Sequence, residues 1–266
     1  MFTRIFAIGD LHGSIHPIEN FYSRNKNKFN FSPETDLIIC LGDVGANFFL
    51  SKRDKKFKKQ LSELPFTYFC IRGNHEARAS DVQSIAPEQW YTEPFGKNDS
   101  TVLVEKQFPH IKYAADIPAI YNINGYKTLT LPGAYSVDKY YRLQNHWTWF
   151  ENEQLTEEEM EKGRRLIEEN DCNFDLILSH TCPLIYEPTD LFLPQVNQST
   201  VDKTMEHYFQ EIEYQTNYRL WLWGHYHEFR VYPYYNNRQC IMLSAGLECI
   251  NVIECLENPQ NYPIKY

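Results

Sequence analysis

Six apolar segments along the chain are each followed at once by a short polar cluster. The six pairs are IFAI with GDLHG, LIICL with GDVG, TYFCI with RGNHE, KTLTL with PGAYS, FDLIL with SHTCP, and RLWLW with GHYH. Apolar runs of this length are typical of strands that are covered on both faces, and the polar cluster marks the loop at the carboxyl end of each strand. We therefore expect buried, largely parallel strands whose polar loops share one edge.

Two helical patterns lie between the later strands. Thr156 and Glu159 have the spacing of a capping box, and apolar residues follow at helical intervals from Met160 onwards. The second pattern repeats near the 3.6-residue period of a helix, at Val201, Met205, Tyr208 and Ile212. Strands and helices therefore alternate, which is typical of the α/β class.

Two pairs of residues predict hairpins. Asn124-Gly125 lies between AIYNI and YKTLTL, and both residues tolerate the left-handed backbone that a two-residue hairpin loop requires. Asn236-Asn237 has a similar context near the end of the chain. The sheets are therefore expected to be mixed, parallel in the βα units and antiparallel at the hairpins.

The chain shows no repeat, low-complexity tract or long linker, so we expect residues 1–266 to form a single domain. One part of it has no clean periodicity. Residues 79–118 carry four prolines, and we expect them to form an irregular insertion or lid over the molecule.

The composition sets limits on partners and location. Lys and Arg number 26 against 35 Asp and Glu, a formal charge of -9, so the overall field repels polyanions and a phosphate must be held by local positive charge. No run approaches the roughly 18 apolar residues of a membrane span, and the first residues lack a secretory pattern. The seven cysteines include no CxxC pair and suit reduced thiols. A cytoplasmic location away from membranes is expected.

The polar clusters at the strand ends share one kind of chemistry. Ligands bind at the carboxyl ends of strands in sheets of this kind. The residues there are Asp10, His12, Asp43, Asn74, His75, His180, His225 and His227. Imidazole, carboxylate and amide donors without thiolates suit Mn, Fe or Zn. A tetrahedral site takes four ligands, so a set of this size can furnish two adjoining sites that share a carboxylate.

The spacing within the clusters supports this interpretation. In Asp10-Leu11-His12 and in His225-Tyr226-His227, the i, i+2 relation at a strand end turns both polar side chains to the same side. Glycines flank the clusters and let the backbone turn sharply close to an ion. One such cluster is weak evidence, but five of them at successive strand ends are a strong joint signal.

In this order the motifs GDLHG, GDVG, GNHE, SHTCP and GHYH resemble those of the calcineurin-like metallophosphoesterase superfamily over residues 5–230. The resemblance implies a four-layer αββα sandwich with two mixed sheets and a dinuclear metal centre. It implies that Asp10, His12 and His227 bind one metal, that Asn74, His180 and His225 bind the other, that Asp43 bridges the two, and that His75 is the general acid for the leaving oxygen.

The second motif departs from one subgroup that the sequence otherwise resembles. GDLHG and RGNHE are similar to motifs of the PPP-type serine/threonine phosphatases and the related diadenosine tetraphosphatases, which carry GDxVDRG where this chain has GDVGAN. Ala46 and Asn47 thus stand where that subgroup has an Asp that orients the catalytic His and an Arg that holds phosphate. Arg142 is a candidate replacement for the Arg, with a surface ion pair as the alternative interpretation. Tyr135 is a second candidate substrate-binding residue.

Two further segments allow two interpretations each. The basic residues between 52 and 59 could bind nucleic acid, but Phe57, Leu61 and Leu64 favour an amphipathic helix with solvated outer faces. The aromatic segment 147–150 could stack a nucleobase, whereas large aromatic residues more often belong to a core.

The function that follows is hydrolysis of phosphate esters, in which two divalent or mixed-valence ions, most simply Mn, Fe or Zn, activate a water for attack on phosphorus. The expected substrate is a phosphate ester of a small molecule or a phosphoprotein, with nucleic acid a lesser option. Two alternatives remain open: a nucleotide phosphodiesterase or dinucleotide polyphosphate hydrolase, which GHYH suggests, and a non-catalytic binding scaffold with the same fold.

Overall fold

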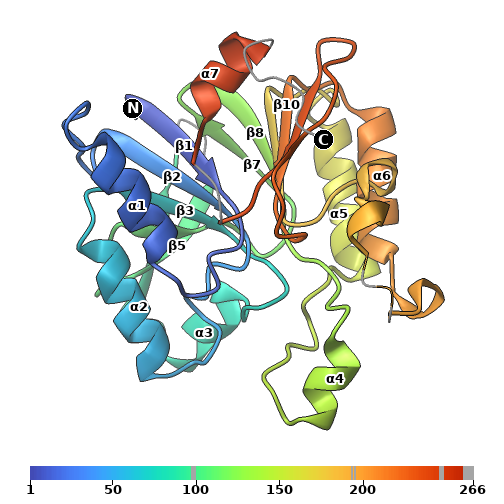
Figure 1. Cartoon of the computed structure of the whole chain (residues 1–266), viewed down its shortest axis with the longest axis horizontal. Helices are drawn as coiled ribbons and strands as arrows, with labels where there is room; N and C mark the ends of the chain where they lie inside the picture. Colours follow the sequence, from blue (N-terminus) through green and yellow to red (C-terminus); the bar gives the residue numbers. More distant parts are fainter. Residues whose placement is uncertain (97–99, 193, 195, 246–248, 260–266) are drawn as a thin grey trace.

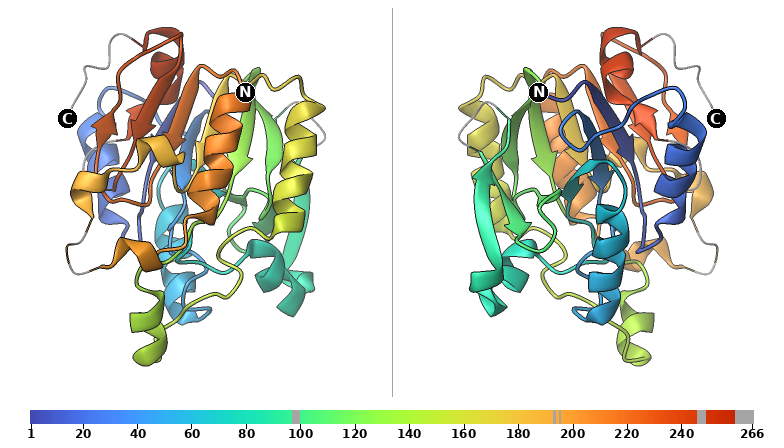
Figure 2. Two further views of the ribbon diagram at one scale, coloured as in Figure 1. Left: turned by 90° about the vertical axis from the view of Figure 1, so that its right-hand side faces the viewer. Right: turned by 90° about the vertical axis from the view of Figure 1, so that its left-hand side faces the viewer.

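The computed structural model describes residues 1–96, 100–192, 194, 196–245 and 249–259. Two mixed β-sheets pack face to face between two layers of helices (Figure 1). The helices α1 and α2 cover the outer face of one sheet, and α5 and α6 cover the outer face of the other (Figure 2). The α-helices are α1 (His16–Asn25), α2 (Lys52–Ser62), α3 (Ala79–Ile85), α4 (Lys139–Gln144), α5 (Glu157–Glu168), α6 (Thr204–Gln215) and α7 (Val252–Glu257). The expected four-layer αββα sandwich is confirmed.

The first sheet has seven strands in the order β13-β1-β2-β3-β6-β5-β4. The central strands β1, β2, β3 and β6 are parallel, and antiparallel strands complete both edges. Their bounds are β1 (Arg4–Ile8), β2 (Asp36–Leu41), β3 (Thr67–Ile71), β4 (Trp90–Pro94), β5 (Thr101–Glu105), β6 (Ile111–Tyr113) and β13 (Ile250–Asn251). The first three apolar runs of the sequence are thus neighbouring parallel strands.

The second sheet has six strands in the order β11-β12-β10-β9-β8-β7. Here β12, β10, β9 and β8 are parallel, and β11 and β7 are antiparallel at the edges. Their bounds are β7 (Ala119–Ile123), β8 (Tyr126–Leu131), β9 (Leu176–Ser179), β10 (Leu220–Trp223), β11 (Arg230–Val231) and β12 (Gln239–Met242). The other three apolar runs supply β8, β9 and β10.

Three apolar clusters hold the layers together. One fills the space between the two sheets, and the other two lie between each sheet and its helices. Phe69 shows how the central cluster packs: its buried ring stacks on Phe95 at 4.8 Å between centroids and meets the edge of Tyr121 at 5.0 Å. Strands with apolar residues on both faces are needed here because each sheet is covered on both sides.

Both predicted hairpin turns are present. Asn124 and Gly125 have φ angles of 58° and 98° and join β7 to β8 in a two-residue loop, with Ile123 opposite Tyr126. Asn236 and Asn237 have φ angles of 50° and 60°, between the paired residues Tyr235 and Arg238. Residues that tolerate the left-handed conformation therefore define these turns.

Residues 79–118 are not the irregular insertion that we expected. The described part of this segment contains α3, a 3₁₀ turn (Pro87–Gln89) and the strands β4, β5 and β6, which extend the first sheet. The prolines occupy positions where each is tolerated: Pro87 begins the 3₁₀ turn and Pro94 ends the edge strand β4. They interrupt the periodicity of the sequence without interrupting the sheet.

The helix predicted from Phe57, Leu61 and Leu64 and the helix predicted after the capping box are present as α2 and α5. Thr156 and Glu159 form the capping box at the start of α5, with both hydrogen bonds made. In α2 the apolar side chains Phe57 and Leu61 face the core, as the amphipathic interpretation expects. Lys58 is an exception among the basic residues of α2, because it is buried and its Nζ lies 2.7 Å from Glu105 Oε2.

None of the helices in the described part of the chain has the length and apolarity needed to span a bilayer. The parallel strands of both sheets direct their carboxyl ends to a common edge, where the loops after β1, β2, β3, β9 and β10 meet. These loops carry the polar clusters that the sequence singled out.

Candidate metal centre

The loops after the parallel strands aim the candidate ligands by an unusual backbone conformation. Five of the seven predicted metal ligands have positive φ angles. They are Asp10 (49°), His12 (46°), Asp43 (48°), His225 (71°) and His227 (57°). A left-handed residue other than glycine costs about 1–2 kcal/mol, although Asp, Asn and His tolerate it better than most. Such strain persists where the surrounding structure fixes it, and it concentrates at functional sites.

One group of candidate ligands consists of Asp10, His12 and His227, whose donor atoms all lie within 4.8 Å of one another. The Nε2 atoms of His12 and His227 are 2.9 Å apart, and His227 Nε2 is 3.9 Å from Asp10 Oδ1. Two imidazole nitrogens and a carboxylate oxygen so close together can hold a divalent ion. These residues come from the loops after β1 and β10.

A second group gathers around Asn74. Its Oδ1 lies 2.9 Å from His180 Nε2 and 3.1 Å from His225 Nδ1. His180 donates from Nδ1 to the carbonyl of Leu41 at 2.7 Å, so its Nε2 is free of a proton in the neutral ring and can bind an ion. Three loops, after β3, β9 and β10, therefore supply three donors to one point.

Asp43 lies between the two groups. Its Oδ1 is 3.4 Å from His180 Nε2, and its Oδ2 is 3.7 Å from His12 Nε2. Oδ1 also accepts a hydrogen bond of 2.8 Å from the backbone N–H of His75, which fixes the carboxylate. Each oxygen thus faces a different group, which is the arrangement that a bridging carboxylate needs.

The residues present fit divalent cations. Asp10 Oδ2 is buried and has no hydrogen-bond partner among the described residues, although a buried carboxylate oxygen normally has one. Burial, with the charge of Asp43 adding to it, raises the pKa of Asp10 to about 8, although His180 acts in the opposite direction. The protein groups alone therefore leave this carboxylate short of positive charge, which a cation would supply.

Asp43 and His180 are both buried and shift each other's pKa in opposite directions. Burial alone would raise the pKa of Asp43, but the nearby imidazole of His180 outweighs it and holds that pKa well below its usual range. For His180, burial lowers the pKa, and the negative charge of Asp43 overcomes this and raises it to about 9. Burial lowers the pKa of His225 well below its usual value, which favours the neutral imidazole that binds metals.

Two glycines make room for these side chains. A Cβ at Gly42 would lie 2.2 Å from His180 Nδ1, and a Cβ at Gly73 would lie 2.1 Å from Asp43 Oδ1. Atoms cannot approach so closely, and Gly42 also has a φ of 88°. The glycines of GDVG and RGNHE are therefore required by the close approach of His180 and Asp43 to the backbone.

Replacing Gly42 by Ala should displace the His180 imidazole and break its bond to the Leu41 carbonyl. Gly125→Ala is a matched control, because Gly125 has a similar φ of 98° but nothing within 4 Å of an added Cβ. Both variants pay for the left-handed backbone, and overpacking should destabilise Gly42→Ala by about 1–3 kcal/mol more. Urea unfolding measures the difference, and equal losses of stability would contradict the packing described for His180.

A chain of hydrogen bonds orients Asn74. Its Nδ2 donates to Ser136 Oγ at 2.9 Å, and both the hydroxyl and the backbone N–H of Ser136 donate to the Glu153 carboxylate. Arg72 Nη1 in turn donates to the Glu153 carbonyl at 2.6 Å. The amide oxygen of Asn74 therefore points toward His180 and His225. Sequence reasoning missed Ser136 and Glu153, and no motif marks them.

His75 lies beside the candidate ligands, and its ring centroid is 5.0 Å from that of His12. Arg142 Nη2 lies 2.8 Å from His75 Nδ1 and 3.0 Å from Nε2. Burial, together with the positive charge of Arg142, lowers the pKa of His75, although Asp43 opposes this. Asp43, His12 and His75 also satisfy the geometry of a possible metal-binding group, so position alone allows His75 two roles.

Arg142 reaches the site from α4, and α4 lies at the lower end of the molecule in Figure 1. The side chain is buried, its Nε donates to Asp138 Oδ2 at 2.7 Å, and its Nη1 donates to the Thr148 carbonyl at 3.1 Å. Asn47, by contrast, is buried and accepts a hydrogen bond from Lys58 Nζ at 2.8 Å. Arg142, which is distant from His75 in the sequence, thus lies beside it in the structure. Asn47 instead contacts α2 through Lys58.

Tyr135 and Trp147, which the sequence also singled out, flank α4 in the chain. Tyr135 is buried, and the Nζ of Lys139 lies 6.0 Å from the centre of its ring. Trp147, which we expected to belong to a core, is 56% exposed at the end of the α4 segment.

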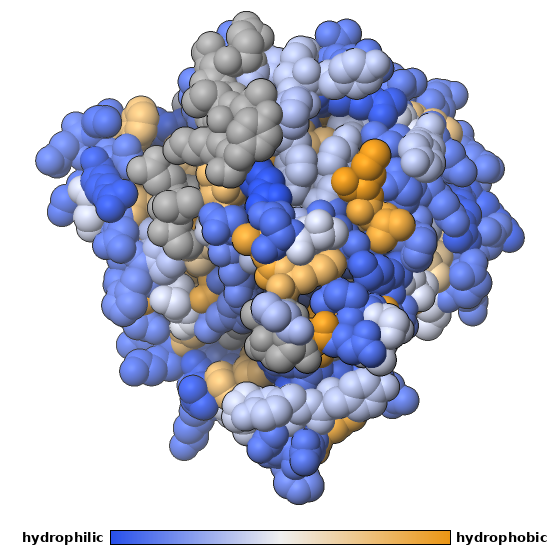
Figure 3. Space-filling model, turned by 45° about the vertical axis from the view of Figure 1, so that its right-hand side comes forward, coloured by the Kyte–Doolittle hydropathy of each residue, from blue (hydrophilic) through white to orange (hydrophobic). Residues whose placement is uncertain are grey.

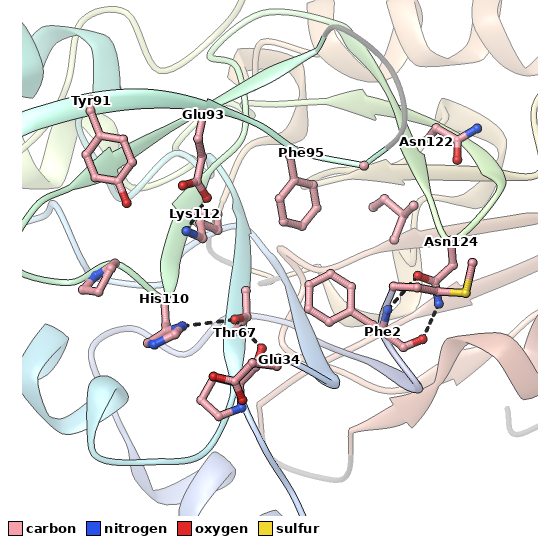
Figure 4. Close-up of a pocket in the computed structure, with 15 residues that line it drawn as sticks. Phe2, Glu34, Thr67, Tyr91, Glu93, Phe95, His110, Lys112, Asn122 and Asn124 are labelled. Atoms are coloured by element: carbon pink, nitrogen blue, oxygen red, sulfur yellow. Dashed lines mark hydrogen bonds and ion pairs between the residues drawn. The ribbon is translucent and has the colours of Figure 1, made fainter.

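The candidate centre is open on one side. Asp10, Asp43, Asn74 and His180 are buried, whereas the side chains of His12 and His227 are 34% and 60% exposed. A substrate could therefore approach past these two histidines. A cavity of about 530 Å³ lies elsewhere, lined by Phe2, Tyr91, Phe95 and the Glu93–Lys112 pair among others (Figure 4). This cavity borders Thr67 at the start of β3, so it lies at the opposite edge of the sheet from the candidate ligands.

The chain belongs to the calcineurin-like phosphoesterase family, whose characteristic sequence matches residues 3–229. This match covers every candidate ligand. Phosphate esters are therefore the substrate class of the family to which the chain belongs, and clusters of possible metal ligands are present in it.

Two solved structures illustrate the likeness in fold. The protein TT1561 of Thermus thermophilus is 14% identical, with 92% of this chain and 91% of that chain covered and a TM-score of 0.51. Phosphopantetheinyl hydrolase (PptH) from Mycobacterium tuberculosis is 15% identical, with 98% of each chain covered and a TM-score of 0.51. At these identities the likeness concerns the fold alone. The comparison with curated proteins gives no match.

Proposed function

We propose that the protein hydrolyses phosphate monoesters with two divalent metal ions, Mn, Fe or Zn. Asp10, His12 and His227 would hold one ion, and Asn74, His180 and His225 would hold the other. Asp43 would bridge them. Bound at these residues, the ions supply Lewis acidity, which lowers the pKa of water and neutralises phosphate charge. The position of Asp43, with one oxygen toward each group of donors, is the observation that carries this proposal.

The chain's own side chains complete the reaction. Arg142 binds the non-bridging phosphate oxygens and positions the substrate against His75. Water adds its oxygen to phosphorus, the ester P–O bond breaks, and His75 donates a proton to the departing oxygen, while a water proton is released. Because Arg142 is held by Asp138 and by the Thr148 carbonyl, its guanidinium stays oriented without substrate.

Monoesters are favoured over diesters by this arrangement. The protein as a whole is acidic, but the metal ions and Arg142 would give this site a local excess of positive charge. Such a site suits a terminal phosphate with two negative charges. The open side at His12 and His227 leaves room for a bulkier diester, so nucleotide phosphodiester hydrolysis is the second candidate. A binding scaffold without activity is disfavoured because the whole predicted ligand set is gathered in one place.

Removal of metal tests the proposal. Protein treated with a chelator should lose hydrolysis of 4-nitrophenyl phosphate, and Mn²⁺ should restore it. Bis(4-nitrophenyl) phosphate, compared under the same conditions, distinguishes monoester from diester preference by the ratio of kcat/KM. Undiminished activity after complete metal removal would refute the metal-dependent mechanism, and an inert protein with two bound ions would favour the scaffold.

A further inference from the structure

Two aromatic rings, Phe48 beside His75 and Phe150 beside Phe48, do not belong to any of the apolar clusters of the described residues. Phe48 follows the GDVGAN motif, and its ring lies 6.2 Å from the His75 ring, inclined by only 21°. Phe150 meets the edge of Phe48 at 6.3 Å. Both side chains are half-buried, so neither ring is needed to fill the interior of the protein.

Arg142 adds a cation to this pair of rings. Its guanidinium carbon lies 5.9 Å from the centre of the Phe48 ring, while its Nη2 contacts His75. A flat cation and a flat aromatic face therefore border the same imidazole. Both groups can pack against a flat aromatic ring, the phenyl ring in an offset or edge-to-face arrangement and the guanidinium over the ring face.

The segments next to Phe48 and around Arg142 also expose apolar side chains. Among the residues that the structure describes, seven of the fourteen exposed large hydrophobic ones come from two short segments, residues 49–50 and 137–147. The space-filling view shows pale side chains of near-neutral hydropathy at the lower end of the molecule, where α4 lies, on a surface that is otherwise mostly hydrophilic (Figure 3). Half of the large hydrophobic side chains exposed on the described residues thus lie on the segment after Phe48 and on the segment that carries Arg142.

We propose that Phe48, Phe150 and Arg142 form a subsite for an aromatic ring in the leaving group of the substrate. This inference rests on the proposed function, in which His75 donates its proton to the leaving oxygen. The leaving group must then extend from phosphorus past His75, and Phe48 is the ring parallel to His75 on its path. The preferred substrates are phosphate monoesters in which a planar ring lies a few bonds from the ester oxygen.

Paired substrates separate aromatic recognition from size and leaving-group chemistry. Benzyl phosphate and cyclohexylmethyl phosphate both release a primary alcohol with a six-membered ring, and only the first ring is aromatic. The protein should hydrolyse benzyl phosphate with a kcat/KM about 3- to 10-fold higher, the range expected for ring–ring contacts beyond their buried area. Adenosine 5′-monophosphate and ribose 5-phosphate form a second pair, which shows whether the ring can belong to a nucleoside.

Variants locate the effect. In Phe48→Leu and Phe150→Leu the aromatic preference should fall toward one. Phe29→Leu is the matched control, because Phe29 is also half-buried, has a guanidinium 5.0 Å above its ring, and contacts Arg4 at the start of β1. It should keep the full preference.

The outcomes are distinct. A ratio near one for both substrate pairs in the unaltered protein, or a preference that persists in both Phe48→Leu and Phe150→Leu, overturns the aromatic subsite while hydrolysis itself stands. If none of the four substrates is hydrolysed by the Mn²⁺-loaded protein, the proposed function fails and the subsite falls with it. A preference in the benzyl pair alone supports the subsite and restricts it to rings close to the ester oxygen.

Discussion

Asp43→Asn should lower phosphate-ester hydrolysis by more than about 1,000-fold and reduce the bound metal from two ions per chain to one or none. The substitution keeps the size of the side chain and an oxygen that can accept the hydrogen bond from the His75 backbone. It removes the negative charge and one of the two oxygens that face the two groups of donors. Loss of about 4 kcal/mol of electrostatic stabilisation corresponds to that decrease in rate.

Asp36→Asn is the control for this variant. Asp36 is another buried carboxylate, at the opposite end of the same strand, where it pairs with Arg4. Its substitution should reduce stability without changing metal content or activity. Elemental analysis of the dialysed proteins, alongside kcat/KM, makes the comparison. An Asp43→Asn protein that retained two ions and its activity would show that Asp43 does not bridge a metal pair.

His75→Ala should reduce hydrolysis of alkyl phosphates by about 10²- to 10⁴-fold, the range for loss of a general acid. The loss should be far smaller for 4-nitrophenyl phosphate, because nitrophenolate leaves readily without a proton. Retention of both bound ions should accompany the change, since Asp43, His12 and His180 keep their places. The plot of log kcat/KM against leaving-group pKa should become steeper in the variant.

His110→Ala serves as the matching histidine control. His110 is half-buried beside Thr67, at the edge of the sheet away from the candidate ligands, and its loss should leave both rates and slope unchanged. If His75→Ala lowered the rates of all esters equally and also removed an ion, His75 would be a metal ligand. The short distances among Asp43, His12 and His75 make this the specific alternative.

The candidate centre was largely predictable because its signal is local in the sequence. Each ligand follows an apolar strand at once, and a flanking glycine marks where a side chain approaches the backbone, as Gly42 and Gly73 do. Parallel strands then bring the ends together. The turns at Asn124-Gly125 and Asn236-Asn237 were predictable for the same reason, since the residue types define the backbone conformation.

Features that depend on contacts between distant segments were not predictable in this way. Pro94 obscured the strand pattern of residues 79–118, although an edge strand tolerates it. The Asn74–Ser136–Glu153 chain joins three loops and has no sequence motif. Arg142 was a candidate from the sequence, but its position depends on α4 folding back so that the guanidinium meets His75, 67 residues earlier.

Anomalous diffraction from crystals of the Mn²⁺-loaded protein tests the central claim most directly. We expect two peaks, one within bonding distance of Asp10, His12 and His227 and the other within bonding distance of Asn74, His180 and His225. Asp43 should contribute one oxygen to each ion. A single ion, or two ions that share no ligand at Asp43, would contradict the dinuclear centre proposed for this protein.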